Sequence, residues 1–218
     1  MQNYTSSNND LFFTLTKRAI DIFGSILFII VFSPIYIGFG LAIWLQDFHS
    51  PIYTHTRIGQ NRKPFTIYKF RSMVVNADAI MMQNKEIYNQ LRSENNKIKE
   101  DPRVTKLGKF IRKYSIDEFP QAFNVLFGTM SWVGPRPLRP DELEIYRAKD
   151  EKTAKQFDVI LTMKPGITGL WQVSGRSNIS FDERLNLEET YAKSKSLALD
   201  LKIMVKTPLV ALKGEGAY

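Results

Sequence analysis

Cysteine is absent from the 218-residue sequence, and histidine occurs only twice, at His49 and His55. The absence of cysteine excludes disulfide bonds and thiolate metal sites, and two histidines are too few for a histidine-rich zinc site. The sequence also lacks a Walker A loop and a G-x-G-x-x-G pattern, so it gives no support to an ordinary nucleotide-binding fold. Its length is sufficient for one domain with a substantial hydrophobic core.

Acidic residues are fewer than basic ones: 22 Asp and Glu stand against 30 Lys and Arg, which gives a formal net charge of +8. An excess of this size favours anionic partners, such as phosphates, anionic lipid headgroups or nucleic acid. Charge alone does not choose among them, because many membrane-surface proteins are basic without binding a specific ligand. Since no nucleic-acid-binding motif is present, we expect no nucleic-acid partner.

Charge is missing altogether from residues 22–45, IFGSILFIIVFSPIYIGFGLAIWL. A straight helix of this length would cover about 36 Å, which exceeds the hydrocarbon core of a bilayer at about 30 Å. The run is too long for a signal peptide, and no small-x-small cleavage site follows it. A buried helix of a soluble protein would be expected to carry a polar face. We therefore predict that this segment inserts into a membrane.

Ser33 and Pro34 interrupt the middle of this run. Proline kinks a helix because it lacks a backbone N–H and clashes with the preceding turn, and the serine hydroxyl can satisfy part of the freed backbone. A central kink allows a re-entrant hairpin with both ends on one membrane face, whereas a kinked spanning helix is the alternative. Basic residues on both sides favour two cytoplasmic ends: Lys17, Arg18, Arg57, Arg62 and Lys63. The residues alone leave both topologies open.

The rest of the chain mixes one predicted hairpin with several predicted helices. Residues 51–73 alternate β-branched and aromatic residues with polar ones around Gly59-Gln60-Asn61, which indicates a β-hairpin. Helical spacing predicts helices over 76–100, 104–114, 141–163, 181–195 and 197–213, the last broken at Pro208. Residues 104–114 and 197–213 are amphipathic, as is typical of helices in a membrane interface. The expected fold class is α+β: a mostly helical, membrane-associated domain with a re-entrant N-terminal membrane helix, a small β-hairpin and interfacial amphipathic helices.

Two acids, Asp117 and Glu118, are the only ones between Lys106 and Pro140, a basic and aromatic-rich segment. One interpretation is structural, because Ser115-x-x-Glu118 matches a capping box with both acids in the first turn of a helix. The other is chemical, because a carboxylate can attack phosphorus to form an acyl phosphate. Mg²⁺ is typically held by one or two carboxylates together with phosphate oxygens of the substrate.

Several basic residues are candidates for phosphate contacts. Arg136 lies between Pro135 and Pro137 on a stiff loop, and a rigid guanidinium suits bidentate phosphate binding. Taken singly, each such residue is more simply interpreted as solvated surface charge. The further candidates are Lys69, Arg71, Arg112 and Arg176.

The order of several long motifs resembles the bacterial sugar transferases, the monotopic phosphoglycosyl transferases. The motifs are KRAIDIFGSILFIIVFSP, YKFRSM, DPRVTKLGKFIRKYSIDEFPQAFNVLFGTMSWVGPRP, MKPGITGLWQVSGR and LDLKIM, and they extend from about residue 17 to the C-terminus. The resemblance implies transfer of a sugar phosphate from a UDP-sugar to polyprenyl (undecaprenyl) phosphate, with release of UMP and a requirement for Mg²⁺. It also implies attachment to the cytoplasmic face of the bacterial plasma (inner) membrane through a re-entrant helix broken at Ser33-Pro34.

The same resemblance implies roles for single residues. Asp117 would be the nucleophile of a phosphosugar-enzyme intermediate and a Mg²⁺ ligand, and Glu118 would orient the metal or accept a proton. The positions that contact phosphate and nucleotide would be Lys69, Arg112, Arg136 and Arg176. Thr129 departs from the family, because many members have Asp there, so the resemblance assigns this position no metal role.

The similarity suggests UDP-galactose or UDP-glucose as donor, because residues 76–100 and the terminal GEGAY resemble the catalytic domain of longer hexose-1-phosphate transferases. The N-terminal membrane bundle of those proteins is missing from this sequence. We expect a polar N-terminal segment and the start of the first helix over 1–16, the re-entrant membrane helix over 17–46 and a cytoplasmic catalytic domain over 47–218. Expected partners are the two substrates, membrane lipids and, as a further candidate, a second copy of the chain.

Two alternatives remain at this level. The first is a non-catalytic scaffold on the membrane surface that binds anionic lipids through its basic residues. The second keeps the reaction but transfers the phosphosugar directly in a ternary complex, without a covalent intermediate.

Overall fold

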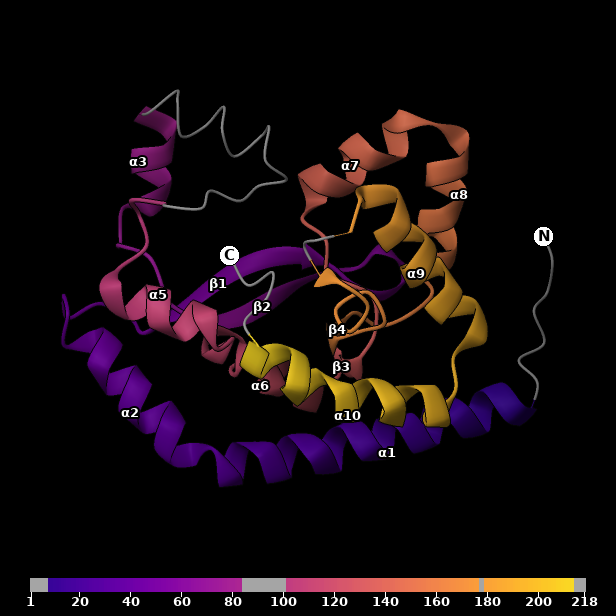
Figure 1. Cartoon of the computed structure of the whole chain (residues 1–218), viewed down its shortest axis with the longest axis horizontal. Helices are drawn as coiled ribbons and strands as arrows, with labels where there is room; N and C mark the ends of the chain where they lie inside the picture. Colours follow the sequence, from indigo (N-terminus) through magenta and orange to yellow (C-terminus); the bar gives the residue numbers. More distant parts are fainter. Residues whose placement is uncertain (1–7, 84–100, 177–178, 214–218) are drawn as a thin grey trace.

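The computed structural model describes residues 8–83, 101–176 and 179–213 (Figure 1). The described part is mostly helical with two small sheets, which confirms the α+β expectation in outline. The elements in chain order are α1 (Asn8–Val31), α2 (Ser33–Trp44), β1 (Ile52–Ile58), η1 (Gln60–Arg62), β2 (Pro64–Phe70), α3 (Ala77–Gln83), α5 (Lys106–Lys113), η2 (Ile116–Glu118), α6 (Gln121–Phe127), β3 (Ser131–Val133), α7 (Pro140–Lys149), α8 (Glu151–Ile160), β4 (Gly166–Thr168), α9 (Phe181–Ser194) and α10 (Leu197–Lys213).

The apolar run is divided between α1 and α2, as the Ser-Pro pair predicts. Pro34 lies in the first turn of α2, and the Ser33 hydroxyl donates to the Ile30 carbonyl at 2.8 Å. Figure 1 shows α1 lying along one edge of the molecule and α2 turning away from it. Within the described ranges no helix alone has the length and hydropathy of a membrane span. Asp10–Val31 and Ser33–Trp44 meet that test only as a pair, bent by 62°.

The predicted hairpin is confirmed as an antiparallel pair of β1 and β2, in a register that places Ile52 opposite Phe70. The turn between the strands contains η1, where Asn61 and Arg62 take positive φ values of 54° and 62°. The buried residue Asn124 connects α6 to the β1–β2 hairpin. Its side chain accepts a hydrogen bond from the Tyr68 N–H at 3.0 Å and donates one to the Thr66 carbonyl at 2.7 Å.

A second sheet pairs β3 with β4 in parallel, with Ser131 opposite Gly166 and Val133 opposite Thr168. The sequence ITGLWQVSGR indicates a short strand or turn over 167–176, and the structure has the end of β4 and a turn there, whereas β3 was not foreseen. The two segments approach so closely that a Cβ on Gly134 would lie 2.3 Å from the Lys164 carbonyl oxygen. Only glycine fits there, and this close approach sets the direction in which the following Pro135-Arg136-Pro137 loop leaves the sheet.

Two helix predictions need correction. Residues 141–163 form two helices rather than one, because the Asp150 carboxylate caps α8 by accepting from the Thr153 N–H at 2.6 Å. Helix α10 continues through Pro208 instead of breaking there, and the Thr207 hydroxyl donates to the Ile203 carbonyl at 2.8 Å in the turn before it. Of the helix predicted over 76–100, α3 is present, and residues 84–100 lie outside the described part.

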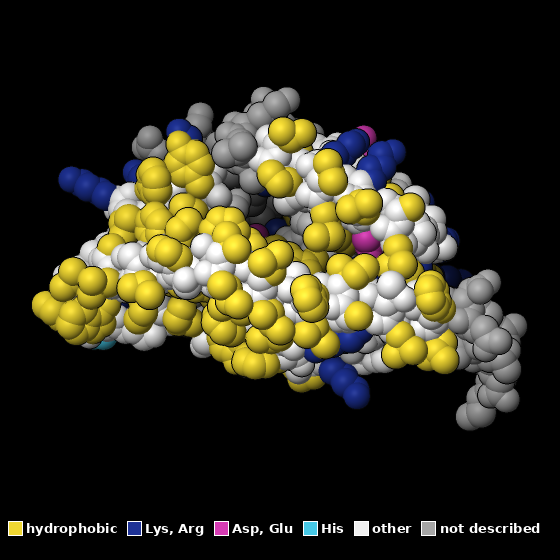
Figure 2. All heavy atoms as spheres, turned by 90° about the horizontal axis from the view of Figure 1, so that it is seen from below, with side chains coloured by type: hydrophobic (Ala, Val, Ile, Leu, Met, Phe, Trp, Pro, Cys, Tyr) yellow, Lys and Arg dark blue, Asp and Glu magenta, His cyan; other side chains and the backbone are white. Residues whose placement is uncertain are grey.

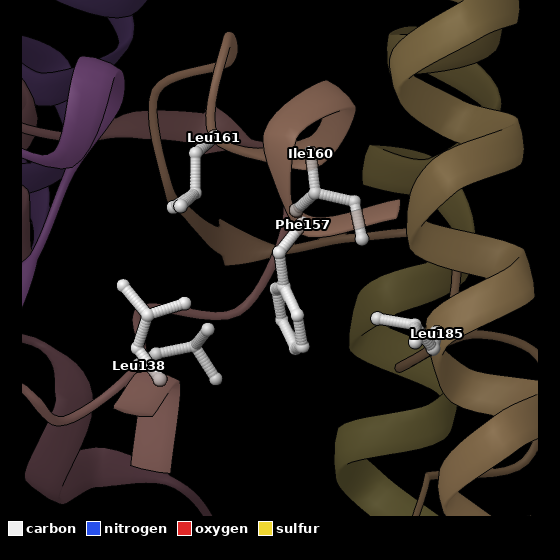
Figure 3. Packing of buried hydrophobic residues seen from close by; sticks show 6 residues of the cluster. Leu138, Phe157, Ile160, Leu161 and Leu185 are labelled. Carbon is white, nitrogen blue, oxygen red and sulfur yellow. The ribbon is translucent and has the colours of Figure 1, made fainter. Parts of the chain in front are cut away.

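Two of the apolar clusters position the elements around the site. One joins α7, α8 and α9, and Figure 3 shows Phe157 lying between Leu138 and Leu185. Another brings together Ile43 of α2, Phe70 of β2 and Ile111 of α5, all nearly or fully buried. The membrane-candidate pair, the hairpin and the helix before the acid pair therefore share one core.

Candidate active site

The acid pair occupies η2, between α5 and α6, and the backbone there differs from the predicted capping box. Ser115 lies in the left-handed region with φ of 56° and makes no side-chain cap bond, and α6 begins only after Pro120. The capping-box interpretation is therefore wrong: a left-handed N-terminal residue turns the chain out of α5 instead of starting a new α-helix.

Helix α5, which precedes the acid pair, is held tightly against the strand that carries Lys69. Its N-cap Thr105 accepts from the Gly108 N–H at 2.9 Å, and the Thr105 N–H donates to the Ser72 carbonyl at 3.1 Å. A Cβ on Gly108 would lie 1.9 Å from the Ser72 carbonyl oxygen, so glycine is required at this contact. The tight packing fixes the position of α5 relative to the end of β2.

Lys69 projects from β2 to both acids. Its Nζ donates to Glu118 Oε1 at 2.7 Å and lies 3.9 Å from Asp117 Oδ2. The Asp117 side chain is 13% exposed and that of Glu118 37%, so the two carboxylates meet different environments. Lys69, which the resemblance assigns to phosphate contact, therefore lies beside both acids.

The pKa values of the two acids move apart. Burial raises the pKa of Asp117 to about 6, and Glu118 adds to the rise, while Lys69 and Arg112 oppose it. Burial also acts to raise the pKa of Glu118, but Lys69, Arg136 and Arg176 outweigh it and the net shift is downward. Neighbouring carboxylates with diverging pKa values are typical of sites where the two groups have different roles.

The other predicted cations surround the pair from three directions. Arg112 of α5 donates from Nε to the Ser72 hydroxyl at 2.8 Å. Arg136 leaves the loop after β3, and Arg176 takes a positive φ of 52° with its N–H donating to the Trp171 carbonyl at 3.2 Å. All of them, with Lys69, act electrostatically on Asp117 or Glu118. Arg71 instead pairs with Asp47 at 2.5 Å, just after α2.

The donor set around the acid pair fits a hard divalent cation such as Mg²⁺. The two carboxylates already converge on a single cation, the Lys69 ammonium. Across residues 8–83, 101–176 and 179–213 no group of three or more His, Cys, Asp and Glu side chains is arranged to hold a metal. Mg²⁺ commonly uses only one or two carboxylates and completes its shell with water and phosphate oxygens, so two acids are sufficient.

Thr129, the departure from the family, has a structural contact instead of a place beside the acids. Its hydroxyl donates to the Asn124 carbonyl at 3.1 Å and accepts from the Asn124 side-chain amide at 3.2 Å. It therefore supports the residue that fastens α6 to the hairpin.

The sequence did not predict a further group of charged residues that lies near Arg136. Arg57 of β1, Glu142 of α7, and Arg184 and Glu188 of α9 are largely buried, and all four influence or contact Arg136 or its neighbours. The sequence contains one weak indication of this group, the Arg-x-x-x-Glu spacing of Arg184 and Glu188 on the helix predicted over 181–195.

Comparison with known proteins places the chain in a family. A family model described as bacterial sugar transferase matches residues 12–214. The chain belongs to the bacterial sugar transferase family. It is 43% identical over 205 residues to a Salmonella typhimurium protein named undecaprenyl-phosphate galactose phosphotransferase, covering 93% of this chain and 41% of that protein. It is 38% identical over 208 residues to the exopolysaccharide production protein ExoY of Sinorhizobium fredii, covering 94% and 88%.

A third relative in the family is the Klebsiella pneumoniae protein named UDP-glucose:undecaprenyl-phosphate glucose-1-phosphate transferase, 37% identical over 209 residues, covering 93% of this chain and 41% of that protein. The chain thus spans about two-fifths of the length of several curated sugar transferases that it matches.

Proposed function

We propose that this bacterial sugar transferase moves a sugar 1-phosphate from a UDP-sugar to undecaprenyl phosphate, releasing UMP, through a phosphosugar intermediate on Asp117. The observation that carries the proposal is the paired carboxylates of η2, one of them only 13% exposed, held among Lys69, Arg112, Arg136 and Arg176. A pyrophosphate-bearing donor needs such a cationic environment beside its nucleophile. The names of the relatives support the same class of reaction.

The proposed transfer consists of two successive displacements at one phosphorus atom. In the first, a carboxylate oxygen of Asp117 bonds to the phosphorus attached to the sugar, and the bond from that phosphorus to the oxygen of UMP breaks. UMP leaves with the bonding electron pair. In the second, a phosphate oxygen of undecaprenyl phosphate bonds to the same phosphorus, the bond to Asp117 breaks, and the free carboxylate is restored.

The surrounding residues divide the remaining work. Asp117 must be ionised to attack, and Lys69 stabilises that form. Glu118, whose pKa is lowered, stays ionised and can accept the proton of the lipid phosphate. Arg136 and Arg176 bind phosphate oxygens of the donor. Mg²⁺, held by Asp117 and Glu118, would supply further neutralisation of phosphate charge.

We also propose that α1 and α2 form a re-entrant anchor at the cytoplasmic face of the bacterial plasma membrane. Both α1 and the residues that follow α2 are hydrogen-bonded to the rest of the domain. Arg18 donates to the Val125 and Leu126 carbonyls at 2.6 and 2.8 Å, and beyond α2 Asp47 pairs with Arg71. A spanning topology would separate these two attachments by a bilayer, so the arrangement supports the re-entrant one.

The exposed side chains agree with such an anchor. Figure 2 shows hydrophobic side chains gathered over the face along which α1 and α2 run. The exposed apolar residues of α1, α2 and α10 include Phe12, Phe23, Ile30, Ile37, Leu201, Val205 and Leu209. An apolar surface of this extent would be costly in water and favourable in lipid, which also supports the interfacial role expected of α10.

The decisive experiment is UMP release by detergent-purified protein with Mg²⁺, undecaprenyl phosphate and a panel of UDP-sugars that includes UDP-galactose and UDP-glucose. We expect release by the wild type and none by Asp117→Asn, because an amide is not a nucleophile. Asp182→Asn is the matched control, since Asp182 is 71% exposed and pairs with Lys149 on the surface. Equal release by Asp117→Asn would contradict the proposed role.

A donor-only incubation separates the remaining alternatives. A phosphosugar adduct found on Asp117 by mass spectrometry would support the two-step route, and persistent absence of an adduct in active protein would favour direct transfer. Vesicle binding without consumption of any UDP-sugar, unchanged in Asp117→Asn, would support the scaffold.

A further inference from the structure

A buried charged cluster lies at Trp171, next to the acid pair, and shares Arg136 with the surroundings of that pair. Its members come from five elements or loops that are distant in the sequence. The cluster consists of Arg57, Arg136, Glu142, Trp171, Arg184 and Glu188. The side chains of Arg57 and Arg184 are only 17% and 16% exposed, and that of Glu188 is 1% exposed.

Trp171 holds two guanidinium groups at its ring. The Arg136 guanidinium carbon lies 5.8 Å from the ring centroid and that of Arg184 lies 5.7 Å away. Arg184 also lies 5.5 Å from the Phe181 ring. Cation–π contacts of this kind position a guanidinium while leaving its N–H groups available to an acceptor.

Several hydrogen-bond donors of this cluster have no acceptor in the described part of the chain. Among the described residues, Arg57 Nε, Arg136 Nε, and Nε and Nη2 of Arg184 are buried without a hydrogen-bond acceptor. The ion pairs Arg57–Glu142 and Arg184–Glu188 measure 3.8 Å each, which is too long for a hydrogen bond. Buried donors without acceptors are costly and call for an explanation such as a ligand.

Another buried arginine of the same chain shows the contrast. Arg103 makes two hydrogen bonds to the Asp101 carboxylate, at 2.9 and 2.7 Å. Arg103 shows that a buried arginine of this chain can direct its donors at a carboxylate, whereas the named donors of the Trp171 cluster do not.

Charge in the cluster is also out of balance. Three arginines face two carboxylates, and one of these, Glu188, uses Oε1 to accept from the Arg136 N–H at 3.2 Å. Burial lowers the pKa of Arg136, and the neighbouring Arg184 lowers it further. An anion with several acceptor oxygens would remove both the unused donors and the excess positive charge.

We propose that Arg184 and Arg136 at the Trp171 ring, together with Arg57, which interacts electrostatically with Arg136, form a phosphate-binding site that takes the nucleotide phosphate of the donor and of the UMP product. This assignment rests on the proposed function. It extends the site from the acid pair to α9, because Arg136 belongs to both groups and acts electrostatically on Glu118. Arg184 is then a substrate-binding residue that was not expected from the sequence.

Trp171 offers a direct readout of this site. The chain contains three tryptophans, so Trp44→Phe/Trp132→Phe leaves Trp171 as the sole tryptophan. We expect its fluorescence to change saturably when UMP is added to the detergent-solubilised protein. Separate titrations with inorganic phosphate, pyrophosphate and undecaprenyl phosphate identify which source of phosphate the site accepts.

Substitutions in this background test Arg184 itself. We expect Arg184→Gln to raise the dissociation constant for UMP by about tenfold or more, because at least one charge-assisted hydrogen bond is lost. Arg184→Lys, which keeps the charge, should give an intermediate value. Lys193→Gln is the matched control on α9, since Lys193 is 62% exposed, and it should bind UMP as the parent does.

Several outcomes would overturn the assignment. They are a Trp171 signal that does not respond to saturating UMP, a response to undecaprenyl phosphate alone, or unchanged UMP binding in Arg184→Gln. If Arg184→Gln does not fold, the UMP titration of the parent protein and the dissociation constant of Arg184→Lys still test the assignment. If the protein binds UMP but releases no UMP from any UDP-sugar, the phosphate-binding site is supported and the proposed function is rejected. If it releases UMP from a UDP-sugar but Arg184→Gln binds UMP as the parent does, the proposed function is supported and the phosphate-binding site is rejected.

Discussion

Lys69 should set the pH at which the enzyme loses activity on the acid side. It lies 3.9 Å from Asp117 and 2.7 Å from Glu118 and favours the ionised form of both. Replacing it by methionine removes the charge and keeps much of the length of the side chain. The pKa of Asp117, already raised by burial to about 6, should then rise further.

The size of the shift follows from the distance. At 3.9 Å, two unit charges interact by about 1 to 4 kcal/mol for effective dielectric constants between about 80 and 20. The Lys69 side chain is 25% exposed, so solvent screening favours the lower part of this range. Since 1.36 kcal/mol corresponds to about one pKa unit, we expect the pKa of Asp117 to reach about 7 or more.

The assay is kcat/KM for UMP release measured from pH 5 to pH 9, which reports the ionisation of the free enzyme. A nucleophile that must be ionised gives a rate that falls as pH drops through its pKa. The wild type should lose half its plateau value near pH 6, and Lys69→Met near pH 7 or above. Lys69→Arg, which keeps the charge, should stay close to the wild type.

The opposite pattern would refute this reasoning. If Lys69→Met lowers the rate equally at every pH and leaves the acid midpoint in place, Lys69 does not control the ionisation of the acid pair. The midpoint belongs to the coupled pair, so an adduct trapped on Asp117 is the measurement that assigns it to one residue.

Three further predictions concern the surroundings of the site. Tyr36→Phe removes the hydroxyl that donates to the Phe119 carbonyl at 2.5 Å. It should lower kcat severalfold and the melting temperature by only about 2 to 4 °C, with Tyr114→Phe as control. Gly108→Ala would place a Cβ 1.9 Å from the Ser72 carbonyl oxygen and should destabilise the fold by about 2 kcal/mol or more, measured by denaturant unfolding, whereas Gly38→Ala meets nothing within 4 Å and should not. Pro34→Ala should straighten the bend towards a spanning helix, so that a cysteine placed near the N-terminus becomes labelled from outside the cell. External labelling of the wild-type N-terminus would reject the re-entrant topology.

Local sequence signals predicted the parts of the fold that local chemistry decides. Alternation of residue types in 51–73 gave the hairpin, and the Ser33-Pro34 pair gave the break between α1 and α2. The split at Asp150 was missed although its signal is local, because the Asp150 side chain caps α8 by accepting from the Thr153 N–H. Strand β3 has only three residues, which is too few for any periodicity to reveal it.

Long-range packing decided the parts that the sequence did not reveal. Ser115 reads as an ordinary N-cap, yet the packing of α5 and β2 places it in the left-handed region. The cluster around Trp171 joins β1, the loop after β3 and α9, so residues more than 100 positions apart meet there. Neither a propensity nor a spacing rule connects Arg57 with Arg184.

The bend between α1 and α2 links the proposed anchor to the acid pair. Phe28 and Phe32, at the end of α1, pack edge-on against Phe119, with ring centroids 5.0 and 5.3 Å away, and Tyr36 of α2 bonds to its carbonyl. Phe119 directly follows Glu118, so the apex of the bend contacts the backbone that carries both carboxylates. A lipid phosphate approaches from the bilayer, whereas a UDP-sugar approaches from water, so a nucleophile serving both must lie at their boundary. An anchor that contacts Phe119, the residue next to the acid pair, meets this requirement of the proposed reaction, and it accounts for the aromatic core that the proposed anchor and the proposed catalytic segment share.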